Sequence, residues 1–254
     1  MSSTVPNDIL ANSSSLVSLS LVDCNLQGEF PFTQIFQLPK LEVLLLDFNP
    51  NLTGHLPEFH YGTPLRTLSV YDCNFSGHIP SSLQNLRQLV YLDLRSNELQ
   101  GMLPRTLSEL RNLEVLDLSE NKLSGPVELD IFLELQKLYE LDLSGNFLSL
   151  NAKTNLNATF PKFKFLNLES CNLRGTLPEL LLDQDKLEFL DLGNNSIHGQ
   201  IPPSICNLTT LGVLSLGSNH LSGILPSCLG SLSANLFALE ISNNNLGGML
   251  PSSL

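Results

Sequence analysis

At 254 residues the chain is long enough to bury a large core. Its composition, with 42% hydrophobic and 15% charged residues, excludes a disordered protein. The 13 Lys and Arg against 25 Asp and Glu give a net charge of −12, which disfavours nucleic acid and anionic membrane surfaces as partners. A membrane helix needs roughly 18 or more consecutive apolar residues, and no such stretch occurs. The start, MSSTVPND, lacks the basic and apolar segments of a secretory signal, so we expect a soluble folded piece.

One repeat runs through the whole chain. The segment Leu113 to Gly125, LEVLDLSENKLSG, shows its template, L-x-x-L-x-L-x-x-N-x-L-x-G. The Asn position recurs at Cys24, Asn49, Cys73, Asn97, Asn121, Asn146, Cys171, Asn195, Asn219 and Asn244. The steps between neighbours are 24 or 25 residues, and this regular period predicts a leucine-rich-repeat solenoid of about ten repeats.

Each repeat is expected to contain a short strand followed by a compact outer segment. Alternation such as Leu92, Asp93, Leu94 places one strand face in the core and the other in solvent. In chain order, the strands should pair in parallel as the concave sheet of an α/β right-handed superhelix. The convex wall should be 3-10, irregular or short-helical, because Gly permits a tight turn and the Pro three residues later prevents a long helix. This spacing occurs at Gly77 to Pro80, Gly101 to Pro104, Gly199 to Pro202 and Gly223 to Pro226.

The domain prediction is a single leucine-rich-repeat domain over residues 1–254. Both ends are expected to cut through a repeat, so that the domain is partial. An irregular outer loop is predicted at about residues 147–162, where LSLNAKTNLNATFPKF lacks the Gly-x-x-Pro wall. The strands on either side should continue through Leu143 and Leu168.

The Asn position has a physical role. A buried Asn offers two donors and an acceptor, which can satisfy turn backbone groups of its own and the adjacent repeat. Cys24, Cys73 and Cys171 occupy the same position, and we expect them to be free, buried, structural thiols. Cys206 and Cys228 lie 22 residues apart on the outer wall of successive repeats, where they form either a disulfide or two unpaired half-buried thiols.

N-glycosylation sequons are dense for one chain. They occur at Asn12, Asn51, Asn74, Asn157, Asn194 and Asn207. A repeat rich in Asn, Ser and Thr produces some of these by accident, but with the repeat type and the two outer cysteines they favour an exported glycoprotein.

Three stretches carry a resemblance to a known family: LSGPVEL at Leu123 to Leu129, FPKFKFLNLESCNL at Phe160 to Leu173, and Ile205 to Leu229, which begins ICNLTTL and ends LPSCL. They resemble plant receptor-like proteins, which are membrane-anchored immune and developmental receptors without a kinase domain. The resemblance implies a plasma-membrane protein whose extracellular part recognises a peptide, protein or glycan. It also implies signalling through a partner receptor kinase.

Enzymatic chemistry finds no support in the residue pattern. His55 and His78 follow the outer-wall Gly of successive repeats, but no metal-type cluster of His, Cys and carboxylates is present. An acidic column consists of Asp93, Asp117, Asp142, Asp191 and Glu240. Leu-Asp-Leu is ordinary for the solvent-facing position of this repeat, so the column does not indicate paired catalytic carboxylates. We predict that the chain is not an enzyme and uses no cofactor or metal.

The concave strand wall is the predicted ligand surface, because a repeat array offers many side chains there on one rigid face. One patch comprises Tyr71, Tyr91, Asp93 and Arg95, with Arg95 beside Tyr71. A second patch comprises Phe165, Glu169, Phe189 and Asp191, with two Phe rings stacked on adjacent strands. Aromatic and Arg side chains are the commonest interface anchors. A glycan on Asn194 would shield part of the second patch, so we expect the first to make the main contacts.

Three functions remain open. The leading interpretation is the ligand-binding ectodomain of a plant cell-surface receptor. A secreted plant inhibitor of cell-wall-degrading enzymes uses the same repeat type, but it is a compact protein capped at both ends. A scaffold or non-functional receptor fragment is the third.

Overall fold

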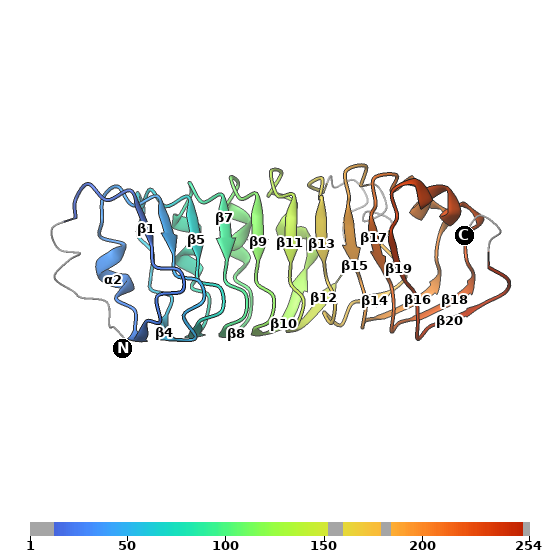
Figure 1. Ribbon diagram of the computed structural model, residues 1–254, viewed down its shortest axis with the longest axis horizontal. Helices are drawn as coiled ribbons and strands as arrows, with labels where there is room; N and C mark the ends of the chain where they lie inside the picture. Colours follow the sequence, from blue (N-terminus) through green and yellow to red (C-terminus); the bar gives the residue numbers. More distant parts are fainter. Residues whose placement is uncertain (1–12, 152–159, 179–183, 251–254) are drawn as a thin grey trace.

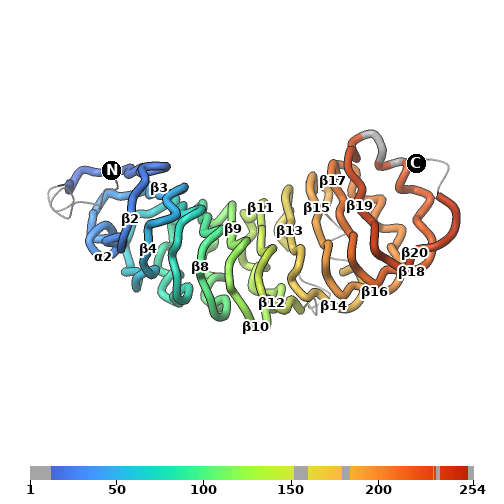
Figure 2. The backbone as a smooth tube through the Cα atoms, turned by 60° about the horizontal axis from the view of Figure 1, so that its bottom comes forward, coloured from blue at the N-terminus to red at the C-terminus, as the bar shows by residue number. Residues whose placement is uncertain are grey.

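Ten short parallel strands form one continuous sheet along the inner side of an elongated, curved solenoid (Figure 1). The computed structural model describes residues 13–151, 160–178 and 184–250. Figure 2 shows the arc of the chain, with its two ends far apart. The strands are β1 (Ser18–Ser20), β3 (Val43–Leu45), β5 (Thr67–Ser69), β7 (Tyr91–Asp93), β9 (Val115–Asp117), β11 (Glu140–Asp142), β13 (Phe165–Asn167), β15 (Phe189–Asp191), β17 (Val213–Ser215) and β19 (Ala238–Glu240). The leucine-rich-repeat solenoid predicted from the period is confirmed.

A second wall of strands follows each turn and is divided into two parallel sheets. The first contains β2 (Gln27–Glu29), β4 (Asn51–His55), β6 (Asn74–Gly77), β8 (Glu98–Gly101), β10 (Lys122–Glu128) and β12 (Phe147–Asn151). The other contains β14 (Arg174–Gly175), β16 (Ser196–Gln200), β18 (His220–Ile224) and β20 (Asn245–Gly247). The sequence pattern did not predict these strands.

Short helices complete the outer side. They are α2 (Phe32–Ile35) and the 3-10 helices η1 (Ser81–Asn85), η2 (Arg105–Glu109), η3 (Leu129–Phe132), η4 (Pro203–Asn207) and η5 (Ser227–Ala234). The described helices are no longer than eight residues. Pro80, Pro104 and Pro202 immediately precede η1, η2 and η4 in extended conformation, so the Gly-x-x-Pro motif starts each helical turn as well as preventing a long helix.

The core is a column of leucines shared between successive repeats. Leu92 and Leu94 point inward from β7, Leu99 from β8 and Leu107 from η2, and all are essentially inaccessible to solvent. Each repeat thus buries its apolar face only by contact with its neighbours, which is the physical reason for stacking.

The asparagine positions form the predicted hydrogen-bond ladder. The Nδ2 group of Asn97 donates to the carbonyls of Val70 (2.8 Å) and Leu94 (3.1 Å), while its Oδ1 accepts from the amide of Phe75 at 2.9 Å. One side chain therefore satisfies backbone groups of two repeats. Where Cys73 replaces Asn, its thiol donates weakly to the Leu46 carbonyl at 3.3 Å.

The residue before each ladder position commonly adopts a left-handed backbone. Ser96, Glu120 and Ser218 have φ values of 51°, 52° and 54°. A non-glycine residue in this region is strained and persists only when its surroundings hold it there. The ladder amide of Asn97 donates to the carbonyls of Leu94 and Arg95, the two residues before Ser96, and so holds the turn.

The irregular loop predicted at about residues 147–162 is wrong for its first five residues. Residues 147–151 form strand β12, whose whole length pairs with Ser124 to Glu128 of β10, so this part is regular. The Leu-Ser-Leu alternation alone satisfies the pairing, and the missing Gly-x-x-Pro does not prevent it. Residues 152–159 lie outside the described residues. The flanking strands β11 and β13 pair without interruption, as predicted.

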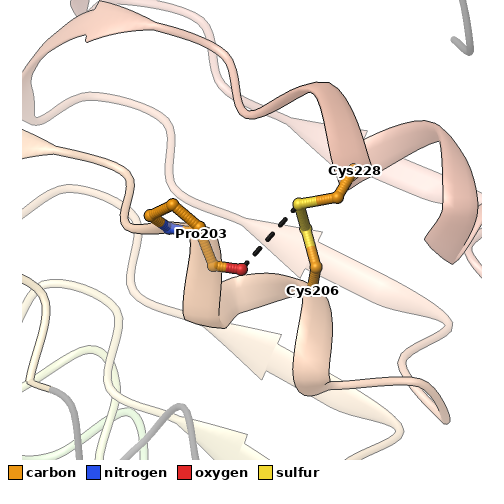
Figure 3. The surroundings of a disulfide bond; sticks show 3 residues. All are labelled: Pro203, Cys206 and Cys228. Carbon is orange, nitrogen blue, oxygen red and sulfur yellow. Dashed lines mark hydrogen bonds between the residues drawn. A yellow bond between two sulfur atoms is a disulfide. The ribbon is translucent and has the colours of Figure 1, made fainter.

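The cysteine predictions hold with one correction. Cys206 on η4 and Cys228 on η5 form a disulfide with Cα atoms 5.9 Å apart (Figure 3). Figure 3 also shows the Cys228 sulfur near the Pro203 carbonyl. Cys73 and Cys171 are free and buried, as predicted, whereas Cys24 is free but exposed. Cys24 belongs to the repeat of β1, the end strand of the sheet, so no further described repeat covers it.

Candidate functional site

Outward side chains on the concave sheet form three rows, because the parallel register aligns equivalent positions. The first row includes Thr67, Tyr91, Val115, Glu140, Phe165, Phe189 and Val213. The middle row includes Ser69, Asp93, Asp117, Asp142, Asn167, Asp191 and Ser215. The third row, two residues further along each chain segment, includes Tyr71, Arg95, Ser119, Ser144, Glu169, Gly193 and Gly217. From β1 to β19 all three rows lie in described residues, and Arg95 is their only basic residue.

The arginine cluster consists of Tyr71, Tyr91, Asp93, Arg95 and Asp117. The Arg95 guanidinium lies 3.8 Å from the centroid of the Tyr71 ring, which confirms the predicted neighbours. Its Nε is 3.5 Å from Asp93 Oδ2 and its Nη1 is 3.7 Å from Asp117 Oδ2. These are ion-pair distances, beyond the range of good hydrogen bonds. The Arg95 side chain remains 41% exposed, so the cluster presents a fixed cation to solvent.

Three carboxylates of the middle row are buried, which corrects the prediction that they face solvent. Asp93, Asp117 and Asp142 are 3%, 7% and 9% exposed, whereas Asp191 is half-buried and Glu240 is exposed, as predicted for the column. At Asp93 the longer side chains of Tyr91 and Arg95 both reach the carboxylate. Asp117 accepts hydrogen bonds from the amide and hydroxyl of Ser119, at 3.0 and 2.6 Å.

Burial changes the protonation of Asp93 and Tyr91. Burial raises the pKa of Asp93 to about 6; the Asp117 and Asp47 charges raise it further, while the Arg95 amide and guanidinium lower it. Burial, then the Asp93 charge, raises the pKa of Tyr91 to about 12, so its hydroxyl stays protonated. That hydroxyl donates to Asp93 Oδ2 at 3.4 Å. The role of Asp93 is therefore to position the Tyr91 hydroxyl and the Arg95 guanidinium.

A groove of about 550 Å³ lies over the first row between β11 and β17. We call it the phenylalanine groove, and it is lined by Tyr139, Glu140, Lys164, Phe165, Glu188, Phe189, Thr210, Gly212, Val213, Asn235 and Phe237. Phe165 and Phe189 stack with centroids 4.3 Å apart and planes 9° apart, as the sequence predicted. Phe237 is 83% exposed and forms part of the rim.

The sequence analysis did not identify several groove residues. Tyr139, Lys164, Glu188 and Phe237 occupy the position directly before the first-row residue of their strands. The signal that points to it is Gly212, because a glycine at that position lets the ring of Phe237 pack over its strand.

The predicted ligand residues of the second patch divide between the groove and its surroundings. Phe165 and Phe189 line the groove, whereas Glu169 and Asp191 lie in the third and middle rows beside it. Burial raises the pKa of Glu169, and the Asp191, Glu120 and Asp142 charges act in the same direction. The surface around the stacked rings is therefore electronegative.

Four of the six sequon asparagines lie on the described surface. Asn51, Asn74, Asn194 and Asn207 are exposed. The Nδ2 of Asn194 donates to the Ser170 hydroxyl at 2.8 Å, next to the third row. Asn12 and Asn157 lie outside the described residues.

His55 is the last residue of β4, and His78 directly follows the neighbouring strand β6. The His78 Nδ1 is 3.1 Å from the Gln100 carbonyl, and the His55 Nε2 is 3.4 Å from the Ser76 hydroxyl. Within the described ranges, no group of three or more His, Cys, Asp or Glu residues has the arrangement of a metal site. In the same ranges, no helix has the length and apolar character required to cross a membrane.

Family models match the repeats directly. Two descriptions of the leucine-rich repeat fit the chain, one over residues 63–123 and the other over residues 186–208 and 210–232. The first segment contains the arginine cluster. The second contains the strands of Phe189 and Val213.

Two curated relatives are receptor-like proteins of Arabidopsis thaliana. Receptor-like protein 6 is 47% identical over 81 residues, which cover 32% of this chain and 8% of the relative. Receptor-like protein 1 is 28% identical over 182 residues, covering 68% of this chain and 17% of the relative. The chain thus spans under a fifth of the length of either relative.

Solved structures extend the similarity to the whole chain. A plant peptide hormone receptor, RGFR1 in complex with RGF2, is 29% identical with a TM-score of 0.77, covering 100% of this chain and 44% of that one. A plant ice-binding protein is 30% identical with a TM-score of 0.72, covering 93% of this chain and 74% of that one. The repeat region shared with the receptors is a non-catalytic binding structure, which confirms that the chain is not an enzyme.

Proposed function

Because the chain belongs to the leucine-rich-repeat family of plant receptor-like proteins, we propose that it is the ligand-binding ectodomain part of a cell-surface receptor. Its concave sheet binds an extracellular peptide or protein. Signalling then passes through a partner receptor kinase, as the resemblance to receptor-like proteins implies. A plant ice-binding protein shares the fold, so the proposal rests on side chains of the concave face as well as on architecture.

The observation that carries the proposal is the arginine cluster. Arg95 is held on Tyr71 and beside two buried carboxylates, yet its guanidinium still reaches solvent. A side chain fixed before binding loses little conformational entropy when a ligand arrives. Tyr91 adds a protonated hydroxyl on the adjacent row. Tyr71, Tyr91 and Arg95 are therefore the proposed first contacts.

The second patch supplies further contacts in this proposal. Phe165 and Phe189 offer apolar area at a groove, with Glu169 and Asp191 beside it. The exposed amide of Asn194 lies close to this region, and a glycan attached there would restrict access to it. Ligand contacts near Phe189 should therefore strengthen when that glycan is removed.

The test uses a random dodecapeptide library displayed on phage and selected on the 254-residue chain. Selected peptides are then synthesised, and their binding is measured by fluorescence anisotropy. Tyr91→Ala should weaken binding by about tenfold or more, the loss typical of an interface anchor. Arg95→Lys keeps the charge but loses the planar fork, and it should weaken binding several-fold.

The matched control is Arg105→Lys on η2, an exposed arginine of the outer wall. Its binding should equal that of the wild-type chain. Equal losses in Arg105→Lys and Arg95→Lys, or no loss in Tyr91→Ala, would remove the concave face from the proposal. Circular dichroism of each variant separates loss of binding from loss of folding.

A further inference from the structure

The phenylalanine groove combines aromatic surface with an excess of negative charge. Between β11 and β17, the three outward rows contain four carboxylates. These are Glu140, Asp142, Glu169 and Asp191. Glu188 adds a fifth at the rim, and the amine of Lys164 is the opposing charge there. A ligand that enters this region meets a net negative potential, which favours a cation.

The protonation behaviour of the carboxylates agrees with this charge balance. Burial raises the pKa of Glu140, and the charges of Asp117 and Asp142 raise it further, while Arg95 lowers it. The neighbouring charges are mostly of the same sign, so the electrostatic repulsion is only partly relieved within the protein. A cation arriving from outside would relieve it.

The stacked rings leave aromatic faces for such a cation. Phe165 and Phe189 are nearly parallel and sit on neighbouring strands, so each covers only one face of the other. The second face of Phe189 is directed along the first row toward β17, where the next residue is the smaller Val213. In the described residues, the cation–π contacts are Arg87 over Tyr61 and Arg95 over Tyr71, so no internal cation covers the Phe rings.

Gly212 and Phe237 shape the groove at this point. A methyl group added to Gly212 would lie 2.7 Å from Cε1 of Phe237, so the Phe237 ring occupies the space over the glycine. The groove beside this ring is lined by Phe189 and Glu188, which supply an aromatic and an acidic side chain.

The arginine cluster shows how such a site is filled within the same protein. There, a guanidinium lies 3.8 Å from an aromatic centroid on the neighbouring strand while carboxylates approach its nitrogens. The groove has the aromatic face and the carboxylates, but the corresponding cation is missing from its rows. Lys164 supplies one amine at the rim, but no cation–π contact is formed with the Phe rings in the described residues, so a ligand could supply the cation over them.

We propose that the phenylalanine groove binds an arginine or lysine side chain of a peptide ligand, stacked on Phe189 and paired with Glu188. This inference rests on the proposed peptide-binding function and specifies the chemistry of the ligand: a basic residue placed over β15 and β17. The preferred residue is arginine, because its planar guanidinium stacks on rings and pairs with carboxylates simultaneously.

The direct test uses small probes and does not require the natural ligand. The full chain is labelled at the phenylalanine rings and titrated with N-acetyl-arginine amide, and separately with the neutral isostere N-acetyl-citrulline amide. Phe165→Leu and Phe189→Leu assign the two ring signals in the NMR spectra. The arginine probe should shift both signals saturably, and the citrulline probe should not.

Charge variants locate the contact. Glu188→Gln should weaken arginine binding about threefold, as for a partly exposed ion pair. Its matched control, Glu109→Gln on the exposed surface of η2, removes the same charge and should leave binding unchanged. Lys164→Ala removes the competing amine and should strengthen binding. Equal effects of Glu188→Gln and Glu109→Gln would show non-specific attraction to an acidic protein and overturn the proposal.

The remaining outcomes separate this inference from the proposed function. In one outcome, Tyr91→Ala weakens binding of the library peptides, but the Phe ring signals do not shift with the arginine probe. This outcome overturns the basic-residue proposal and leaves the receptor proposal in place. Ring shifts caused by arginine support the groove even when the selected peptides are indifferent to Tyr91. Shifts caused by cellobiose but not by arginine would assign the groove to a carbohydrate and overturn the proposal.

Discussion

The arginine cluster and the phenylalanine groove occupy the same rows of the same sheet, but they balance their charges differently. In the cluster, Arg95 stacks on Tyr71 and faces two buried carboxylates. In the groove, Phe165 and Phe189 stack on each other, and the carboxylates around them have no basic residue in their rows. The same repeat template therefore gives two kinds of surface, depending on which residues occupy its outward positions. In one, a basic residue of the rows pairs with the carboxylates; in the other, the rows contain no such residue.

The arginine cluster and the phenylalanine groove also differ in how much they contribute to folding stability. Groups that satisfy one another inside the fold contribute to the folded state, whereas groups left incompletely satisfied favour a partner. Removal of Arg95 should therefore lower folding stability as well as remove a proposed ligand contact. Changes at the groove should affect binding first.

The largest expected effect is the loss of stability in Arg95→Ala. The variant leaves the buried Asp93 and Asp117 carboxylates without their cation, and we expect a decrease of about 2–3 kcal/mol in the free energy of unfolding, because breaking a buried ion pair leaves an uncompensated charge. Urea unfolding measures it. The comparison variant is Arg111→Ala, whose partner Glu134 forms an exposed pair; its cost should stay below about 1 kcal/mol. Equal costs for the two variants would contradict the structural role of Arg95.

The second effect is a dependence of stability on pH that comes from Asp93. Its pKa is about 6 in the folded protein, above the usual aspartate value of 3.8, so the folded state binds the proton more strongly than the unfolded state. The contribution is therefore fully present below about pH 4 and is lost as the pH rises through about 6, which changes stability on the order of 2 kcal/mol. Unfolding at about pH 5 and about pH 7.5 should show greater stability at the lower value.

Asp93→Asn tests the origin of that dependence. The amide does not titrate, so the difference between the two pH values should shrink. Asp142, Glu140 and Glu169 also have raised pKa values and leave a residual slope of the same sign. A slope that is unchanged in Asp93→Asn would assign the effect to those groups.

The sequence predicted the architecture well because the repeat encodes it locally. The spacing of Leu, Asn and Gly determines which residues are buried and which form turns, and this spacing recurs in ten repeats. The contacts between Arg95 and Tyr71 and between Phe165 and Phe189 followed from the register alone. Residues one repeat apart are neighbours in a solenoid, so contacts between residues far apart in the sequence can be predicted from the repeat length.

Other features depend on side-chain size and could not be read from the period. The alternation correctly points Asp93 outward, but its burial follows from the reach of Tyr91 and Arg95 over it. The groove depends on the missing side chain of Gly212 and on the position of the Phe237 ring, which no pattern specifies. The second wall of strands is set by backbone pairing after the turn.

A smaller effect is expected from Asn167→Asp, which makes the middle row of the groove resemble that of the cluster. Asn167 donates to Asp142 Oδ2 at 3.0 Å and to the Ser144 hydroxyl at 3.1 Å, so its amide interrupts a run of carboxylates. The substitution replaces a donor by a like charge between Asp142 and Asp191, and should cost about 1–2 kcal/mol at neutral pH. Thermal unfolding at about pH 4.5 should recover most of the loss, since protonation removes the repulsion. A loss that persists there would indicate a packing effect instead.

The smallest expected effect on folding, and the sharpest test of the open site, is Gly212→Ala. The added methyl group would meet Cε1 of Phe237 at 2.7 Å, but that ring is 83% exposed and can move aside, so stability should change by less than about 0.5 kcal/mol. The methyl group displaces the Phe237 ring that lines the groove, and binding of N-acetyl-arginine amide should weaken about threefold because the groove beside Phe189 changes shape. Gly217→Ala is the matched control, because Gly217 lies in the third row outside the groove and its methyl group would meet Oε1 of Glu240 at 3.0 Å. Equal arginine affinity in the two variants would show that the part of the groove beside Gly212 is not where the cation binds.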